Sequence, residues 1–438
     1  MNRNRWYVLA LLLSVYMIHH LDRQVVTLLL VPIGAEFKLT DGQLGLLAGA
    51  AYALSLAIAG VPLGMLIDRV HRVRLLSGLV ALWSGLTALC ALAQSFSALL
   101  LMRIGIGAAE SGGTPTNLSL LSDYFDRKGR STAVGIYMMG PSLGTILGFA
   151  LAGVIAANYG WRAAFLAAGI PGLFLALMLF MTVREPLRGA GDAVAGVDAV
   201  KAPPLKESLK LLWSNRTIVH LIVGLTLANT VAAGVSVWLP ALLMRNHGAT
   251  VQTAGLSIAF GVATFAALAS FCSGMLADKV GAKAPDGVPR MAALAALLTI
   301  PCIVYGALTS NYVVVIAAFA VKTVAHVLVN TPGYALTLSL APPQIRGTTM
   351  AVLQVAGNLF SYGVGPQLIG SLSDALQPLA GTNSLRYSVA IFGCLNLWAM
   401  FHLLRAGHWL RRAHAAERLQ TQKKGGGESA LVTDLRGV

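Results

Sequence analysis

The sequence predicts an all-α membrane protein with 12 transmembrane helices, arranged as two pseudo-symmetric bundles of six helices. Of its 438 residues, 56% are hydrophobic and 11% are charged, about half the charged share of an average soluble domain. The apolar residues form runs of about 20, the length at which an α-helix crosses a hydrocarbon layer of roughly 30 Å. Few runs alternate as strands do, so the pattern favours helices over a barrel.

The apolar runs divide into two sets of six along the chain. They cover residues 7–33, 44–66, 75–93, 98–121, 131–156, 162–183, 216–243, 252–276, 291–309, 312–340, 348–372 and 386–406. We predict an N-terminal bundle over residues 1–183 and a C-terminal bundle over residues 216–406. Residues 184–215 are charged and rich in Gly, Pro and Ala, which predicts a cytoplasmic linker. Residues 407–438 form a predicted cytoplasmic C-terminal tail.

An internal repeat supports this division. The segment GMLIDRVHRVR at residues 64–74 follows the second run, and GMLADKVGAK at residues 274–283 follows the eighth. Likewise, GPSLGTILG at residues 140–148 in the fifth run is echoed by GPQLIG at residues 365–370 in the eleventh. Parallel repeats of a helical bundle are the device by which one class of secondary transporters builds a site between two halves.

The positive charge indicates topology and excludes nucleic acid as a partner. The formal net charge is +15. With both termini inside, one side of the membrane carries Arg3, Arg5, Arg69, Arg72, Arg74, Arg127, Lys128, Arg130, Arg184, Arg188, Lys279, Lys283, Arg290, Arg346, Arg411 and Arg412. The other side carries only Lys38, Arg162, Arg245 and Arg386. This asymmetry follows the positive-inside rule and predicts a multi-pass protein of the cell (inner) membrane with cytoplasmic termini.

Two motifs resemble the major facilitator superfamily, over the whole length of the chain. The superfamily pattern G-x-x-x-D-R-x-x-R-[KR] between spans 2 and 3 is matched by Gly64, Asp68, Arg69, Arg72 and Arg74. The glycine motif of span 5 is matched by Gly135, Gly140, Pro141, Gly144 and Gly148. The resemblance implies that Gly64, Asp68, Arg69 and Arg72 form a cytoplasmic latch, with a weaker second copy at Asp278.

Within the superfamily, the chain is most similar to the spinster-like transporters. The matching segments are LDR at 21–23, RIGIGAAES at 103–111 and LLSDYFDRKGRSTAVGIY at 120–137. Anion–cation symporters share the aspartate–arginine pair of span 1 and the pattern R-x-x-x-G-x-x-E of span 4. The chain departs from the spinster pattern at His19 and His20, which replace Asn and an aromatic residue, and at Ser111, which replaces Ala.

Charged residues inside the predicted spans are the candidate coupling site. The only acidic ones are Asp22 and Glu110, and the basic ones away from the ends of the spans are Arg23, Arg103 and Lys322. Burial disfavours a charged carboxylate and a nearby guanidinium favours it, so relative movement of such groups switches proton affinity. Spinster-like transporters are thought to use the positions of Asp22, Arg103 and Glu110 for proton coupling. A structural ion pair between spans 1 and 4 is the alternative.

The spacing of these residues refines the expectation. Arg103 and Glu110 are seven residues apart, so they share a helix face within ~20° but lie ~10 Å apart along the axis. A third group fits between them, and Asp22 is the expected partner of Arg103. We expect Asp22 and Glu110 to be protonated in alternation, while Arg103 anchors whichever is ionised.

Span 10 supplies a polar stripe for substrate binding. Lys322, His326 and Asn330 are spaced i, i+4, i+8 and share one helix face, which we expect to line a cavity. Lys322 would attract an anionic head group, unless it snorkels to an interface. Arg103, Arg23 and His19 are further candidate substrate ligands, although packing would also explain the latter two.

Small residues and prolines predict bends and caps. Gly140-Pro141 and Gly365-Pro366 are expected to kink spans 5 and 11, which rocking of the two halves requires. Thr40 to Gln43, at the start of span 2, predicts a capping box and no further role.

The sequence lacks the motifs of enzymes, ATP-driven pumps and channels. No G-x-S-x-G, HExxH, Walker A or dinucleotide motif stands in a suitable context, and no filter loop is repeated. The four cysteines show no Cys-x-x-Cys spacing, so neither a disulfide framework nor a metal site is predicted. The sequence therefore predicts a monomeric, membrane-embedded secondary transporter that is not an enzyme, needs no cofactor and uses the proton gradient.

The substrate class stays open between three readings. The spinster resemblance implies a lysolipid or sphingoid amphiphile moved by rocker-switch alternating access. The anion-symporter resemblance implies a small organic acid, such as a sugar acid or an aromatic carboxylate. Drug/proton antiport is the third reading.

Overall fold

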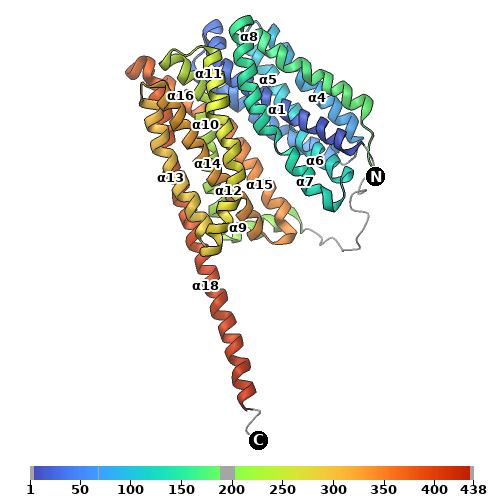
Figure 1. Cartoon of the computed structure of the whole chain (residues 1–438), viewed down its shortest axis with the longest axis vertical. Coiled ribbons are helices and arrows are strands. Elements are labelled where there is room, and N and C mark those ends of the chain that lie inside the picture. The colour runs from blue at the N-terminus through green and yellow to red at the C-terminus, as the bar shows by residue number, and fades with distance from the viewer. Residues whose placement is uncertain (1–3, 68, 188–202, 435–438) are drawn as a thin grey trace.

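The first half of the molecule consists of helices that follow the first six apolar runs. The computed structural model describes residues 4–67, 69–187 and 203–434, which contain helices and no strand (Figure 1). The helices of this half are α1 (Arg5–Phe37), α2 (Asp41–Gly45), η1 (Leu46–Ala50), α3 (Ala51–Ile67), α4 (Arg72–Leu89), η2 (Cys90–Leu92), α5 (Phe96–Glu110), α6 (Gly113–Tyr124), α7 (Arg127–Tyr137) and α8 (Gly140–Thr182).

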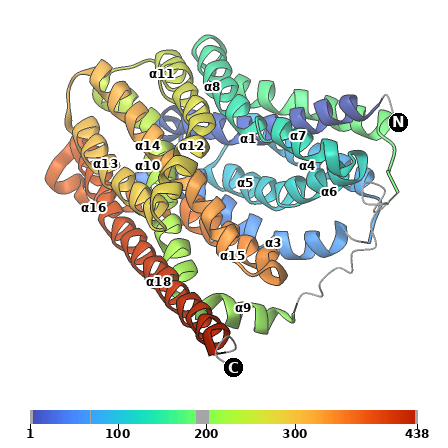
Figure 2. The same cartoon turned by 60° about the horizontal axis from the view of Figure 1, so that its bottom comes forward.

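The second half repeats this arrangement along the rest of the chain. Its helices are α9 (Leu205–Ser214), α10 (Arg216–His247), α11 (Val251–Ile258), η4 (Ala259–Ala263), α12 (Thr264–Lys283), α13 (Gly287–Leu308), α14 (Tyr312–Leu340), η5 (Pro343–Ile345), α15 (Arg346–Asn358), η6 (Leu359–Val364), α16 (Gly365–Ala380), η7 (Gly381–Asn383), α17 (Ser384–Gly393) and α18 (Asn396–Asp434). Figure 2 shows the two halves as separate groups, blue to green and yellow to red.

Length and composition mark most of these helices, with the exception of α1, α5, α6 and α9, as membrane-spanning. In the described part of the chain, 8 helical segments are long and apolar enough to cross a bilayer. Two of them, 129–182 and 343–416, each hold two predicted spans. In the first, Gly160 takes a left-handed conformation with φ 82°, which turns the chain between the spans.

Two segments outside the predicted bundles also contain helix. Helix α9 lies within the predicted linker, of which residues 188–202 fall outside the described ranges. Helix α18 continues from the last span into the predicted tail and ends at Asp434. Figure 1 shows it projecting from the bundle.

Among the described residues, contacts near α2 and α16 join the two halves at one end of the structure. One apolar core cluster contains residues of both halves, among them Leu44, Trp238 and Ile369. A second cluster, with Leu212, Leu353 and Leu403, belongs to the second half alone. Helix α2 packs on α16, and η1 packs on η6. Away from this joined end, α6 and α7 pack within their own half, as does α15.

The predicted bends coincide with interruptions of the helices. Helix α7 ends at Tyr137 and α8 begins at Gly140, followed by Pro141. In the second half, the π-helix η6 ends and α16 begins at Gly365, followed by Pro366.

The glycine motif of span 5 also sets how closely helices approach. A Cβ atom on Gly144 would lie 2.1 Å from the carbonyl oxygen of Met17 in α1, and one on Gly148 would lie 2.9 Å from Cβ of Gln24. Small residues let membrane helices approach in this way. The motif therefore places the polar face of α1 directly against α8.

We expect Gly144→Ala to lower the melting temperature of the purified protein. The added methyl group meets a backbone oxygen that cannot rotate away, so α1 and α8 must separate, at a cost of about 1–3 kcal/mol. Gly135→Ala is the matched control, since nothing lies within 4 Å of its Cβ position. Equal melting temperatures for the Gly144 variant and the wild type would contradict the packing described.

Candidate functional site

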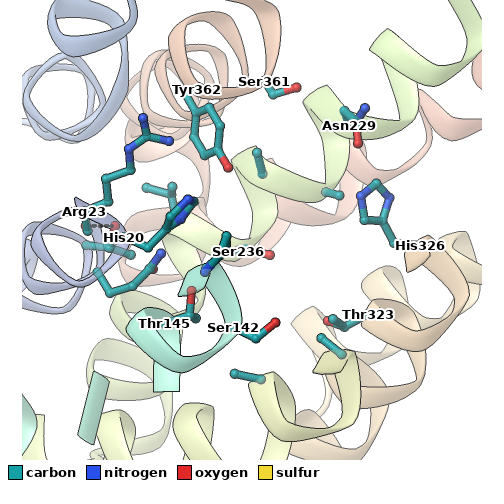
Figure 3. Close-up of a pocket in the computed structure, with 18 of the residues that line it drawn as sticks. His20, Arg23, Ser142, Thr145, Asn229, Ser236, Thr323, His326, Ser361 and Tyr362 are labelled. Atoms are coloured by element: carbon teal, nitrogen blue, oxygen red, sulfur yellow. Dashed lines mark hydrogen bonds between the residues drawn. The ribbon is translucent and has the colours of Figure 1, made fainter. Parts of the chain in front are cut away.

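A cavity of about 600 Å³ lies between the two halves; it is called the central cavity below. The first half contributes Tyr16, His20, Arg23, Gln24, Thr27, Tyr52, Arg103, Ser142 and Thr145 among its polar lining residues. The second half contributes Asn229, Ser236, Lys322, Thr323, His326, Asn330, Tyr334, Gln354, Asn358, Ser361 and Tyr362. Figure 3 shows side chains of both walls pointing into this space.

The joined end of the halves is held by a polar cluster that we call the Asp41 clamp (Asp41, Arg245, Ser373 and Asp374). Arg245 Nη1 donates to Asp41 Oδ1 over 2.6 Å, and Ser373 Oγ donates to Asp41 Oδ2 over 2.7 Å. The Asp374 carboxylate accepts from the backbone N–H groups of Asp41 and Gly42, over 2.9 and 2.8 Å. The clamp therefore connects span 2 of the first half to spans 7 and 11 of the second.

The sequence prediction for this segment was incomplete. The capping box forms as expected: Gln43 N–H donates to Thr40 Oγ1, and Thr40 N–H donates to Gln43 Oε1. The expectation of no further role was wrong, because Asp41 carries the contacts between the halves. A sequence shows the local cap, but not the distant partners of the residue beside it.

Glu110 lies at the centre of a buried polar cluster next to the central cavity. Its Oε2 accepts the hydroxyl hydrogen of Tyr52 and lies 3.7 Å from Arg23 Nε and 3.6 Å from His19 Nε2. Arg23 also donates to the Tyr52 hydroxyl over 2.7 Å. Glu110 is 1% exposed, so an ionised carboxylate here depends on these partners.

Arg23 connects this cluster to the opposite wall. Its guanidinium carbon lies 4.6 Å from the ring centroid of Tyr52 and 5.0 Å from that of Tyr362. Tyr52 belongs to the first half and Tyr362 to the second, so one cation bridges the two halves through two aromatic faces. Figure 3 shows the guanidinium of Arg23 beside the ring of Tyr362.

The expected pair of Asp22 with Arg103 does not form in the described part of the chain. Asp22 Oδ2 accepts a hydrogen bond from Thr87 Oγ1 over 3.2 Å, and Asp22 Oδ1 has no partner among the described residues. Arg103 stacks on the Tyr52 ring at 4.9 Å and donates to the carbonyl of Leu47 over 3.4 Å. Helical spacing alone suggested a third group beside Arg103, but that group is an aromatic ring and not a carboxylate.

Of the two residues of span 1 expected to bind substrate, one lines the cavity and the other does not. Arg23 lines the cavity as expected. His19, proposed as a substrate ligand, lies behind the wall, 6% exposed and against Glu110, with its ring 6.2 Å from that of Trp83. His20 lines the cavity instead. Consecutive residues of a helix point about 100° apart, so His19 and His20 face different directions.

The polar stripe of span 10 lies on the cavity wall. Lys322, His326 and Asn330 all line it. Lys322 Nζ donates to the carbonyl of Ala232 and to Ser236 Oγ, each over 3.0 Å, and the side chain is 2% exposed. Asn330 Oδ1 accepts from Asn229 Nδ2 over 3.3 Å. Within the described residues, Lys322 forms no ion pair with a carboxylate.

Among the described latch residues, Arg69, Arg72 and Asp278 form no ion pair with one another in this structure. Arg72 is 2% exposed and binds Asp123 of the first half over 2.6 Å and Glu185, at the start of the predicted linker, over 2.7 Å. Arg69 and Asp278 are exposed, and Gly64 has nothing within 4 Å of its Cβ position. Asp68 lies outside the described residues. Arg72 thus anchors α4 to α6 and to the start of the linker.

Sequence reasoning missed the residues that connect the charges. Tyr52, Thr87 and Tyr362 each contact a charged group named above, yet a tyrosine or threonine in an apolar span is ordinarily a packing residue. Among the described residues, no group of three or more His, Cys, Asp or Glu side chains is placed to hold a metal ion.

Comparisons with known proteins agree with this architecture. The family profile described as the Major Facilitator Superfamily matches residues 12–422. The chain belongs to the Major Facilitator Superfamily. It is therefore a multi-pass membrane transporter and not an enzyme, and the predicted fold class is confirmed.

The individual relatives include a spinster homologue, an efflux pump and an organic-acid transporter. A crystal structure of a bacterial homologue of the human lysosomal transporter Spinster, inward-facing and unoccupied, is 27% identical, with a TM-score of 0.81, covering 94% of this chain and 97% of that one. An MFS-type efflux pump of Mycolicibacterium smegmatis is 25% identical over 389 residues, 87% of this chain and 88% of that protein. The probable L-galactonate transporter of Escherichia coli is 25% identical over 400 residues, 88% and 86% of the two chains.

We expect Asp41→Asn and Arg245→Gln to be strongly non-additive in their effects on unfolding. Each removes the same partly buried ion pair across the halves, so a double-mutant cycle should give a coupling free energy of about 0.5–3 kcal/mol. The exposed Glu36–Arg162 pair, within the first half and with side chains 40% and 41% exposed, is the matched control and should couple by less than about 1 kcal/mol. Additive losses for Asp41 and Arg245 would contradict the clamp.

Proposed function

We propose that the protein is a proton-coupled secondary transporter that works by rocker-switch alternating access. The observation that carries this proposal is the Arg23 bridge, which connects the buried Glu110 carboxylate in the first half to Tyr362 in the second. The mechanism needs a proton site whose charge influences how the two halves meet, and Arg23 supplies such a link.

The contacts define what protonation of Glu110 would do. With Glu110 ionised, Arg23 is held between that carboxylate and the Tyr52 hydroxyl. A proton on Glu110 removes the charge attraction, so Arg23 is free to move towards the cavity, a substrate or Tyr362. The change in charge is thereby converted into a change in the contact between halves.

Asp22 is proposed as the second proton site. It is 1% exposed and has one oxygen on Thr87 and one without a partner in the described ranges. A buried carboxylate with so few hydrogen-bond donors is more stable in its protonated, neutral form, because burying an unpaired charge is costly. Arg103, stacked on Tyr52, supplies a fixed positive charge at the same wall.

The lining of the central cavity supports a substrate with an anionic head group and an apolar part. Arg23 and Arg103 lie on one wall and Lys322 on the other, while Phe149 and Val262 provide apolar surface. Together with the likeness to the Spinster homologue, this favours a lysolipid or sphingoid-type amphiphile. No cofactor is proposed: the proton gradient is the driving force.

A small organic anion is the alternative substrate. Cations on both walls, together with hydroxyl and amide side chains such as Ser142, Asn229 and Gln354 in the lining, also suit a sugar acid or an aromatic carboxylate. The L-galactonate relative supports this reading, and the efflux-pump relative supports drug/proton antiport.

Orientation and assembly complete the proposal. On the basis of the positive-inside rule, we propose that both termini lie on the cytoplasmic side of the cell (inner) membrane and that the joined end with the Asp41 clamp faces outside. The structure then corresponds to a state open to the cytoplasm. We propose that the protein acts as a monomer, because each half finds its partner within the same chain.

Gradient-driven uptake into proteoliposomes tests the proposal. A pH gradient should drive uptake of lysophosphatidylglycerol or sphingosine 1-phosphate, which carry anionic head groups, by the wild type. Glu110→Gln should reduce this uptake to the background of empty vesicles, because the carboxylate that is coupled to Arg23 can no longer carry a proton. Exchange without a gradient should persist in that variant. Glu36→Gln, which removes an exposed carboxylate, should retain wild-type uptake.

Two results would change the account. Full gradient-driven uptake by Glu110→Gln would overturn proton coupling at this site. Glu110-dependent uptake of gluconate or benzoate, with none of the lipids, would retain the coupling and assign the protein to the organic-anion symporters.

A further inference from the structure

A second concentration of positive charge lies far from the central cavity, where α18 leaves the predicted membrane region. The guanidinium carbons of Arg216, Arg405 and Arg412 lie 4.6, 5.9 and 5.4 Å from the ring centroid of Trp409. We call these four residues the Trp409 cluster. Arg216 is the first residue of α10, and the other three belong to α18.

The charges of the Trp409 cluster are not balanced by the protein in the described ranges. The nearby carboxylate, Asp286, is already engaged by Arg290 and, at 3.2 Å, by Arg411. Within those ranges, Arg216, Arg405 and Arg412 have no carboxylate oxygen within 4.0 Å. Three guanidinium groups around one ring repel one another, and an anion bound between them would relieve that repulsion.

The surroundings of the cluster indicate a lipid as the source of the anion. Trp398 precedes Arg405 by seven residues, so the two share a face of α18. Trp398 and Phe401 are 55% and 53% exposed, and Trp213 on α9 is 53% exposed. Tryptophan at this level, with arginine one or two turns beyond it, is typical of a membrane interface. Along α18, apolar side chains are followed by cations. This matches a phospholipid, in which the acyl chains are followed by the charged head group.

We propose that the Trp409 cluster binds the phosphate of an anionic phospholipid from the leaflet on the basic, cytoplasmic side of the membrane. Guanidinium groups bind phosphate oxygens in bidentate pairs, and basic pockets between transmembrane helices hold such head groups. Because Arg216 and Arg405 come from different helices, the lipid would link α10 to α18. This inference is independent of the transported substrate.

The fold does not depend on this lipid, which makes the site testable by substitution. Helices α10 and α18 already contact each other through His220 and His402, whose Nδ1 atoms lie 2.9 Å apart. Gly224 packs against Leu403 at the same interface. Arg405 and Arg412 are exposed, so replacing them leaves the packing of these helices intact.

The test measures lipid binding to the delipidated full-length protein. Native mass spectrometry detects the bound lipid, and the shift in melting temperature reports the stabilisation. Dioleoyl-phosphatidylglycerol should bind and stabilise the wild type, and dioleoyl-phosphatidylcholine should do so at least about tenfold more weakly. Arg405→Gln/Arg412→Gln should weaken phosphatidylglycerol binding by about tenfold or more, at roughly 1 kcal/mol for each charge. Lys279→Gln/Lys283→Gln, which removes two exposed charges from α12 in the same half, is the matched control.

Three results would overturn the proposal. They are equal binding of the two lipids, unchanged phosphatidylglycerol binding by the double arginine variant, and an equal loss in the lysine control. Glycerol phosphate is the probe for a soluble anion. If it protects the wild type as well as the lipid does at equal concentration, the cluster binds a free anion and not a membrane lipid.

Discussion

The structure depends on how one buried negative charge is kept inside a membrane-embedded bundle. Glu110 lies in a helix surrounded by apolar residues, where an isolated charge costs several kcal/mol. The protein offsets this cost with the hydroxyl of Tyr52 and the guanidinium of Arg23. Arg23 also contacts Tyr362 of the other half. The guanidinium that stabilises the Glu110 carboxylate is therefore also a contact between the two halves.

The remaining architecture positions this contact. The glycines of span 5 bring α8 close against α1, the helix that carries Arg23 and Asp22. The Asp41 clamp and the shared apolar core hold the halves together at one end, whereas the other ends of α6, α7 and α15 pack within their own halves. In the proposed rocker-switch movement, the end opposite the Asp41 clamp is the end that opens and closes.

The sequence predicted the fold class and the charged residues but not their pairing. Glu110, Arg103 and Lys322 stand out because charge is rare in apolar runs, and the polar stripe of span 10 follows from helical periodicity alone. Pairing between helices depends on their relative rotation and depth, which spacing within one helix does not specify. Asp22 therefore lies against Thr87, and Glu110 against Arg23.

Other functional residues could not be predicted from the sequence, because helix packing or capping already accounts for a residue of that type at that position. Tyr52 resembles any tyrosine that packs in a membrane helix, and Asp41 follows a capping threonine whose cap is complete without it. Only the partners, 58 residues away for Tyr52 and 204 residues away for Asp41, show the further function. His19 and His20 could not be separated for a related reason, since the direction of span 1 relative to the cavity is a property of the assembled bundle.

The most direct test of the account measures whether the charge on Glu110 sets the separation of the halves. Spin labels at Ser131→Cys in α7 and Gln344→Cys in η5, in a background without the four native cysteines, report the distance across the end opposite the Asp41 clamp by double electron–electron resonance. The account predicts a distance distribution that changes between acidic and alkaline buffer in the wild type and stays at its acidic form in Glu110→Gln. The same pH-dependent change in the variant would contradict it.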